Sequence, residues 1–186
     1  MSEYFMLECY GPLDKERAQI QSATNTKGVN WMTGAPLDDP IPEPVKIELH
    51  PRGGIMMPIF KSGILLFSDE VIDAFSQSGV DNFVTYPAEI YHPVEHNTYK
   101  NYKAINIIGL VAAADMSASD AIVHDTPLID VDFDSLTIDP KKAGDFLFFR
   151  LAECVTGIVV HESVKQICDD HGIAGIDWVS PQDWIG

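Results

Sequence analysis

The clearest structural pattern in this chain is ILLFSDEVIDAFSQSGV, residues 64–80. The first four residues are apolar, as in a buried strand, and Ser68 then stands where the N-cap of a helix is expected, with two acidic residues in the first turn. The apolar residues of the following turns share one face, and Gly79 is a typical residue to end a helix. The segment therefore predicts a strand followed directly by an amphipathic helix.

The same pattern occurs again in IVVHESVKQICDDHGIAGIDW, residues 158–178. Here Gly172 is the residue expected to end the helix, and His161 stands where the first copy has Ser68. After each glycine the chain returns to an extended pattern. We predict two strand-helix-strand units of nearly equal length, which suggests a duplicated architecture.

The remaining apolar segments are short, rich in β-branched or aromatic residues, and bounded by Gly, Pro or Asp, as strands usually are. They cover residues 4–10, 45–49, 102–111, 131–138 and 146–151. Strands thus outnumber helices, which predicts an α+β fold with a mixed, largely antiparallel sheet. The chain has 186 residues, 46% of them hydrophobic, without a compositional break, so we expect residues 1–186 to form a single domain.

The charge of the chain is strongly one-sided, with a formal net charge of −16. No Lys or Arg lies between Lys103 and Lys141, although this stretch contains seven aspartates. Such a surface repels nucleic acid and anionic membranes and attracts a basic surface. We therefore expect no nucleic acid and no membrane as a partner. Two interpretations remain, a solvated acidic face that serves solubility or a binding surface for a cationic partner.

Three of these aspartates alternate with apolar residues in Asp130-Val131-Asp132-Phe133-Asp134. In a strand, this alternation places the three carboxylates on one face and the two apolar side chains on the other. Burying three unpaired carboxylates would be very costly, so the acidic face needs solvent or a cationic ligand. The candidate partner-binding residues are Asp115, Asp120, Asp125, Asp130, Asp132 and Asp134. For Asp115, and for Asn106 in the preceding strand, we favour a structural role in which the side chain hydrogen-bonds backbone groups.

One segment matches a catalytic motif. His92-Pro93-Val94-Glu95-His96 fits H-x-x-E-H, in which two histidines hold zinc and the glutamate activates water. A metal-dependent hydrolase using His92, Glu95 and His96 is therefore an alternative function. The motif requires a sustained helix, however, and Pro93 interrupts this stretch, so we favour a loop with two exposed histidines. We expect no catalytic residue, no metal and no other cofactor.

The cysteines and the hydropathy of the chain indicate where the protein resides. Cys9, Cys154 and Cys168 are odd in number and lack C-x-x-C spacing, so we expect reduced, mostly buried thiols. No basic N-terminal region precedes an apolar stretch, and no apolar run approaches the ~18 residues of a membrane span. We expect a cytoplasmic protein.

A series of short motifs occurs along the chain in a characteristic order. They are Trp31-Met32-Thr33-Gly34-Ala35-Pro36-Leu37, a proline-rich connection, Phe67-Ser68-Asp69-Glu70 before a helix, Gly79-Val80 leading to Tyr86-Pro87, Asn106, Asp115, Phe148-Phe149-Arg150-Leu151, and Gly172-Ile173-Ala174-Gly175-Ile176-Asp177-Trp178. In this succession the chain resembles a bacterial family of polymorphic-toxin immunity proteins, immunity family eleven. The resemblance covers about residues 31 to 181 and leaves residues 1–30 unassigned.

The resemblance implies a small intracellular protein, encoded beside a secreted or contact-delivered toxin, that neutralises this toxin by binding it. It implies no catalytic residues. Together with the acidic stretch, it leads us to expect an inhibitor that covers the basic active-site surface of its toxin. Charge complementarity would raise the association rate, and a buried apolar patch would set the residence time. A generic acidic interaction domain is a further alternative.

Overall fold

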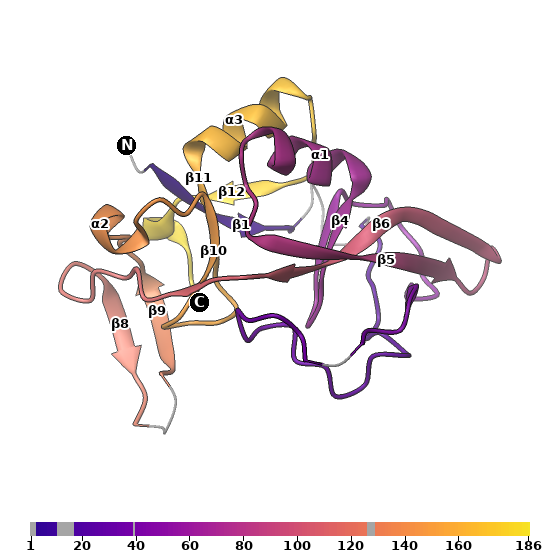
Figure 1. The fold of residues 1–186 in the computed structure, drawn as a ribbon, viewed down its shortest axis with the longest axis horizontal. Coiled ribbons are helices and arrows are strands. Elements are labelled where there is room, and N and C mark those ends of the chain that lie inside the picture. The colour runs from indigo at the N-terminus through magenta and orange to yellow at the C-terminus, as the bar shows by residue number, and fades with distance from the viewer. Residues whose placement is uncertain (1–2, 11–16, 39, 126–128) are drawn as a thin grey trace.

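The computed structural model describes residues 3–10, 17–38, 40–125 and 129–186. Over these residues the chain forms two five-stranded sheets, a two-stranded sheet and helices outside the sheets (Figure 1). The fold is α+β with mixed, largely antiparallel pairing, as predicted. The strands divide between three sheets instead of forming one.

The first sheet has the strand order β12-β1-β11-β10-β7. Its strands are β1 (Tyr4–Glu8), β7 (Leu110–Val111), β10 (Phe148–Leu151), β11 (Ile158–His161) and β12 (Asp177–Val179). Neighbouring strands are antiparallel, except that β10 and β7 are parallel. Strands that lie far apart in the sequence are thus neighbours in this sheet.

The second sheet has the order β2-β5-β6-β4-β3. Its strands are β2 (Val45–Glu48), β3 (Ile59–Lys61), β4 (Leu65–Ser68), β5 (Phe83–His92) and β6 (Asn97–Ile107), and only β2 and β5 are parallel neighbours. The two-stranded sheet pairs β8 (Asp120–Val123) with β9 (Val131–Ser135). The helices are α1 (Asp69–Gln77), α2 (Pro140–Ala143), α3 (Glu162–Asp170) and the short 3-10 helix η1 (Pro181–Asp183).

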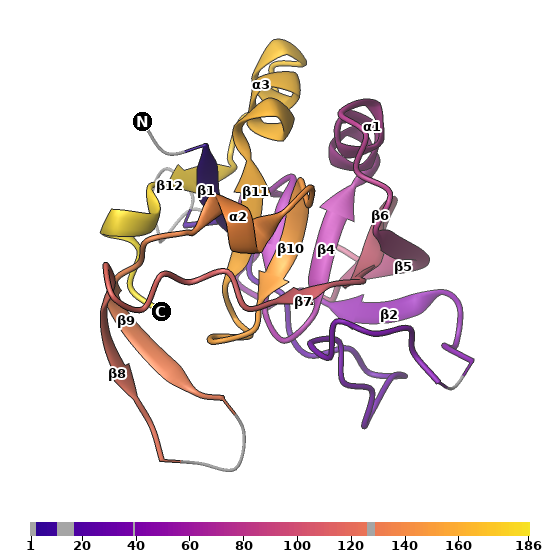
Figure 2. The ribbon, with the colours of Figure 1, turned by 60° about the vertical axis from the view of Figure 1, so that its left-hand side comes forward.

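The two predicted strand-helix-strand units are present and share one topology. In the first unit α1 connects β4 to β5, which run parallel on either side of β6; in the second, α3 connects β11 to β12 on either side of β1. Helices α1 and α3 lie side by side on the same side of the molecule (Figures 1 and 2). Near their C-terminal ends, Gln77 Oε1 and His171 Nε2 are 3.1 Å apart. The duplicated architecture is therefore visible in the order of strands as well as in the sequence.

A shared hydrophobic core joins the first and second sheets. Phe148 of β10 lies at the junction, and its ring centroid is 5.1 Å from that of Phe75, 6.0 Å from that of Phe67 and 6.3 Å from that of Phe83. Asn82 Nδ2 adds a polar link because it donates a hydrogen bond to the backbone carbonyl oxygen of Phe148 at 2.7 Å. The two sheets are thus held together by one aromatic cluster.

A second hydrophobic cluster lies on the opposite face of the first sheet. Met6, Phe149 and Val159 pack there against Phe133 of β9 and against Trp184, all of them buried. These sheet residues alternate along their strands with residues of the shared core, as side chains of a strand do. Strands β1, β10 and β11 of the first sheet are therefore buried on both faces, which accounts for their nearly continuous apolar sequences.

The predicted strand at residues 102–111 is two strands in the structure. β6 begins earlier, at Asn97, and ends at Ile107 in the second sheet, whereas β7 belongs to the first sheet. Between them Gly109 has a φ of 141°, a region open mainly to glycine. Apolar residues continue across the crossing, from Ile107 and Ile108 to Leu110 and Val111, and hide the break. Strands β3 and β8 and helix α2 also lie outside the predicted elements.

The N-terminal ends of α1 and α3 differ from the expectation. Ser68 occupies the N-cap position of α1, but its hydroxyl makes no capping hydrogen bond and is buried without a partner among the described residues. His161 holds the same position in α3, and its Nδ1 accepts a hydrogen bond from the Ser163 backbone N–H at 3.1 Å. In α3 the imidazole of His161 therefore provides a side-chain cap. In α1 the hydroxyl of Ser68, from which such a cap was expected, does not.

This difference leads to a prediction about stability. We expect His161→Ala to lower the free energy of unfolding by about 1 kcal/mol, because α3 loses its cap. Ser68→Ala should be neutral or slightly stabilising, because it removes a buried hydroxyl that has no partner. Urea denaturation measures both changes. His161→Asn is the control, since asparagine restores a capping acceptor, and an equal loss in both alanine variants would contradict the assignment.

Candidate partner-binding surface

The acidic stretch folds into a hairpin that projects from the body of the molecule (Figures 1 and 2). It consists of β8, β9 and their connection, and we call it the acidic arm, residues 120–135; the structure describes these residues except 126–128. The strands pair antiparallel, with Val123 opposite Val131. Beyond this pair, the His124 backbone N–H donates to the Asp130 carbonyl oxygen at 2.9 Å. The arm is thus a hydrogen-bonded hairpin, with a shift of register between Asp120 and Ala121 at its start.

The arm is fixed to the body along one face of β9. Val131 and Phe133 are buried in the second hydrophobic cluster. The N–H and C=O of Phe133 pair with the backbone of Gly186 at 2.8 and 3.0 Å, and the Val131 N–H donates to the Glu153 carbonyl oxygen at 3.0 Å. Val131 and Phe133 point inward and the neighbouring aspartates outward, as the alternation predicted. A surface held in this way loses little conformational entropy when a partner binds.

The outward side of the arm carries five exposed aspartates, and its sequence contains no Lys or Arg. The exposed aspartates are Asp120, Asp125, Asp130, Asp132 and Asp134. Among the ion pairs of the described residues, Asp132 is the only one of the five to take part. The arm therefore carries five of the six candidate residues, all exposed, and this excess of negative charge is favourable for a cationic partner.

Three exposed apolar side chains lie among these aspartates. Ile122, Val123 and Ile129 are 60%, 65% and 63% exposed. These three residues were not predicted as part of the surface, because β8 was not predicted and hydrophobicity alone does not show which apolar residues lie outside the core. A surface of this mixed kind suits a protein partner, since carboxylates speed association and apolar contacts slow dissociation.

A histidine also lies among the aspartates of the arm. His124 Nε2 is 2.8 Å from Asp132 Oδ2. This hydrogen bond, followed by the charges of Asp132 and Asp130, raises the pKa of His124 above its usual value of 6.5. Protonation of His124 lowers the net negative charge of the arm, so affinity for a basic partner should weaken at acidic pH.

The pair can be tested by titration. We expect NMR to place the pKa of His124 above 6.5 in the wild type and closer to 6.5 in Asp132→Asn. Because the pKa is raised on folding, the pair contributes stability below the pKa of the unfolded chain and loses it as pH rises through the folded pKa. The contribution is small for exposed groups, so the chemical shift of the His124 ring is the better readout. An identical titration in both proteins would show that the hydrogen bond is not formed.

Asp115, the sixth candidate residue, lies at the base of the arm rather than on it. Its Oδ1 accepts hydrogen bonds from the Ser117 hydroxyl at 2.6 Å and the Ser117 backbone N–H at 3.0 Å, which lowers the pKa of Asp115. Asn106 is fully buried, and its Nδ2 donates to the Ala35 carbonyl oxygen at 2.9 Å. Both side chains hydrogen-bond backbone groups, in agreement with the structural role favoured for them.

The segment that matches H-x-x-E-H forms the turn between β5 and β6 and is not helical. His92 is 5% exposed, and its Nδ1 accepts hydrogen bonds from the backbone N–H groups of Val94 at 3.3 Å and Glu95 at 3.2 Å. His96 has a φ of 53°, and its Nδ1 lies 2.8 Å from the Tyr91 hydroxyl. The loop was predicted correctly, but the prediction of two exposed histidines is wrong for His92, whose imidazole serves as an acceptor for the turn.

The cysteines lie outside the acidic arm. Cys9 and Cys168 are buried, and burial raises their pKa to about 11 and about 12, so both thiols are protonated and unreactive at neutral pH. Cys154 is a free, partly buried thiol. The part of the chain that the structure describes holds no group of three His, Cys, Asp or Glu side chains able to bind a metal ion. Within the same part, no helix is long and apolar enough to cross a membrane.

A rigid scaffold that presents one acidic and partly apolar element is typical of proteins that act by binding another protein. Comparison with protein families specifies this class, because the immunity protein family Imm11 matches residues 9–183. The chain therefore belongs to this family, as the sequence resemblance indicated, and membership supports a role in toxin immunity. A comparison with curated proteins found no match.

Proposed function

We propose that this protein binds a cognate toxin delivered by a competing bacterium and covers the active site of that toxin with the acidic arm. Membership of the immunity family supports the toxin as partner. The observation that carries the choice of surface is the acidic arm, which exposes five aspartates together with the apolar side chains of Ile122, Val123 and Ile129. The protein acts as an inhibitor and not as an enzyme, in the cytoplasm where the toxin arrives.

The charge of the arm bears on the kind of toxin. Enzymes that act on nucleic acids or nucleotides have basic clefts, because their substrates carry phosphate groups. A projecting element with closely spaced carboxylates can occupy such a cleft and exclude the substrate. The attraction extends over a Debye length of ~8 Å at physiological ionic strength and therefore weakens as salt is added. Ile122, Val123 and Ile129 would be desolvated once the arm is seated, which slows dissociation.

Co-expression tests the proposal. The probe is the toxin encoded next to this protein, expressed from an inducible promoter with and without the immunity protein. We expect survival and a stable purified complex when both are present, and cell death when the toxin is expressed alone. An unrelated toxin of the same activity is the specificity control and should remain lethal. If the neighbouring toxin kills equally well in both strains, the proposed function is wrong.

A further inference from the structure

A cavity of about 230 Å³ lies where the first and second sheets meet. Its charged lining residues are Glu8 at the end of β1, Lys61 at the end of β3 and Arg150 in β10. Its apolar wall includes Met32 and Ile158. Among the described residues of the acidic arm, none lines the cavity.

Arg150 is buried in this cavity without a counter-charge. The side chain is 4% exposed, and one terminal nitrogen donates a hydrogen bond to the Val155 carbonyl oxygen. Its Nε is buried with no hydrogen-bond partner among the described residues, and none of their ion pairs includes Arg150. Burial lowers its pKa to about 10, so the guanidinium is still charged at neutral pH. A buried, unpaired charge costs stability unless something compensates it.

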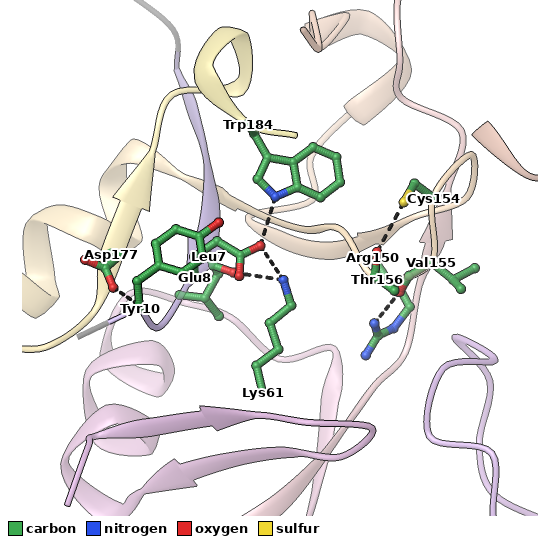
Figure 3. Close-up of polar contacts among 10 residues, drawn as sticks. All are labelled: Leu7, Glu8, Tyr10, Lys61, Arg150, Cys154, Val155, Thr156, Asp177 and Trp184. Atoms are coloured by element: carbon green, nitrogen blue, oxygen red, sulfur yellow. Dashed lines mark hydrogen bonds and ion pairs between the residues drawn. The ribbon is translucent and has the colours of Figure 1, made fainter. Parts of the chain in front are cut away.

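The other cation of the cavity is already compensated. Lys61 Nζ lies 2.5 Å from Glu8 Oε1, and the same oxygen accepts a hydrogen bond from Trp184 Nε1 at 2.8 Å. Figure 3 shows these three residues as one group, with Arg150 apart from them beside the turn that carries Val155. The cavity is left with one positive charge in excess, although the chain as a whole has a net charge of −16.

We propose that this cavity binds a single carboxylate group, with Arg150 as its counter-ion. The planar fork of a guanidinium matches the two oxygens of a carboxylate, and the Arg150 Nε has no hydrogen-bond partner among the described residues. One excess positive charge suits a monoanion, and the apolar wall suits a short aliphatic portion. The volume admits only a small molecule or one side chain. The carboxylate belongs either to a small aliphatic acid of the cell or to an Asp or Glu of a bound protein.

Titration with sodium propionate tests the site on the isolated protein, with sodium chloride at equal ionic strength as reference. We expect the Nε–H resonance of Arg150 in a ¹⁵N NMR spectrum to shift saturably with propionate. The Tm should rise by about 3 °C when propionate reaches about ten times its Kd. Arg150→Met should abolish the Tm response while keeping or raising the basal Tm, because the unpaired charge is gone. Arg52→Met, at an exposed arginine, is the matched control and should respond like the wild type.

Three results would contradict the proposed carboxylate site. The absence of a propionate effect beyond that of chloride would overturn the proposal, as would an equal response in Arg150→Met. Tighter binding of inorganic phosphate than of propionate would overturn the assignment to a carboxylate. If the site responds, competition identifies the source: propionate weakens toxin binding when the toxin inserts an acidic side chain, and leaves it unchanged when the ligand is a free acid. The titration uses no toxin, so its result is independent of the proposed immunity function.

Discussion

Replacing Asp120, Asp125, Asp130, Asp132 and Asp134 together by asparagine is expected to slow association with the toxin by about 100-fold at low salt. Two oppositely charged proteins associate faster than two neutral proteins, because their electric field steers the encounter over many ångströms. The five carboxylates are concentrated on the acidic arm, so their removal abolishes most of this field at the proposed contact. The dissociation rate should change much less, because the exposed apolar side chains remain in place.

The measurement is the association rate constant over a range of ionic strengths. We expect a steep fall with salt for the wild type and a nearly flat dependence for the arm variant. The matched control removes five charges elsewhere, at Glu70, Asp73, Asp81, Glu162 and Asp170, all exposed and outside the arm. Both variants carry the same net charge. A difference between their association rates therefore reports the position of the removed charges and not the net charge of the protein. If the control slows association as much as the arm variant, the arm is not the contact surface.

Phe148→Ala is expected to lower the free energy of unfolding by about 3–5 kcal/mol, a large fraction of the stability of a typical domain. The side chain is fully buried and contacts three aromatic rings, which belong to β4, α1 and the start of β5. Truncation therefore removes apolar burial and leaves a cavity at the junction of the two five-stranded sheets. The loss in the free energy of unfolding is the sum of two contributions, the transfer free energy of the removed ring and the free energy of the cavity that the surrounding strands do not close.

Urea denaturation followed by tryptophan fluorescence measures this loss as a shift of the midpoint. Phe146→Ala is the control, since Phe146 lies two residues away and is 41% exposed. It should cost less, because the side chain is already partly in solvent and its truncation leaves no enclosed cavity. Equal effects of the two substitutions would show that the aromatic cluster does not join the sheets as described.

Much of the architecture could be predicted from local patterns. The two strand-helix-strand units follow from apolar runs, acidic first turns and terminating glycines, and these signals depend on residues close in sequence. The alternation of Asp132 and Asp134 with Val131 and Phe133 likewise predicted which face of β9 is buried. Such features are readable because the backbone periodicity alone dictates the side on which each side chain lies.

Features that depend on distant partners could not be read in this way. Ile108 and Gly109 carry the chain from one sheet to the other, and the apolar pattern is the same on both sides of the crossing. His92 is buried because a turn folds back over its imidazole, and Ser68 lacks the bond that its residue type normally makes. The uncompensated charge of Arg150 depends on which residues surround β10, which one sequence does not specify.

The position of β1 has a consequence for the order of events during synthesis. Its residues pair with β11 and β12, for example Tyr4 with His161 and Leu7 with Trp178. These contacts span most of the chain, and long-range pairing of this kind forms late and slowly. Phe133, which anchors the acidic arm, packs on the face that this sheet completes. A nascent chain on the ribosome thus lacks an anchored arm until residues 158–186 have emerged. If the arm binds the toxin as proposed, protection of the cell should lag behind translation by the time that this last pairing takes.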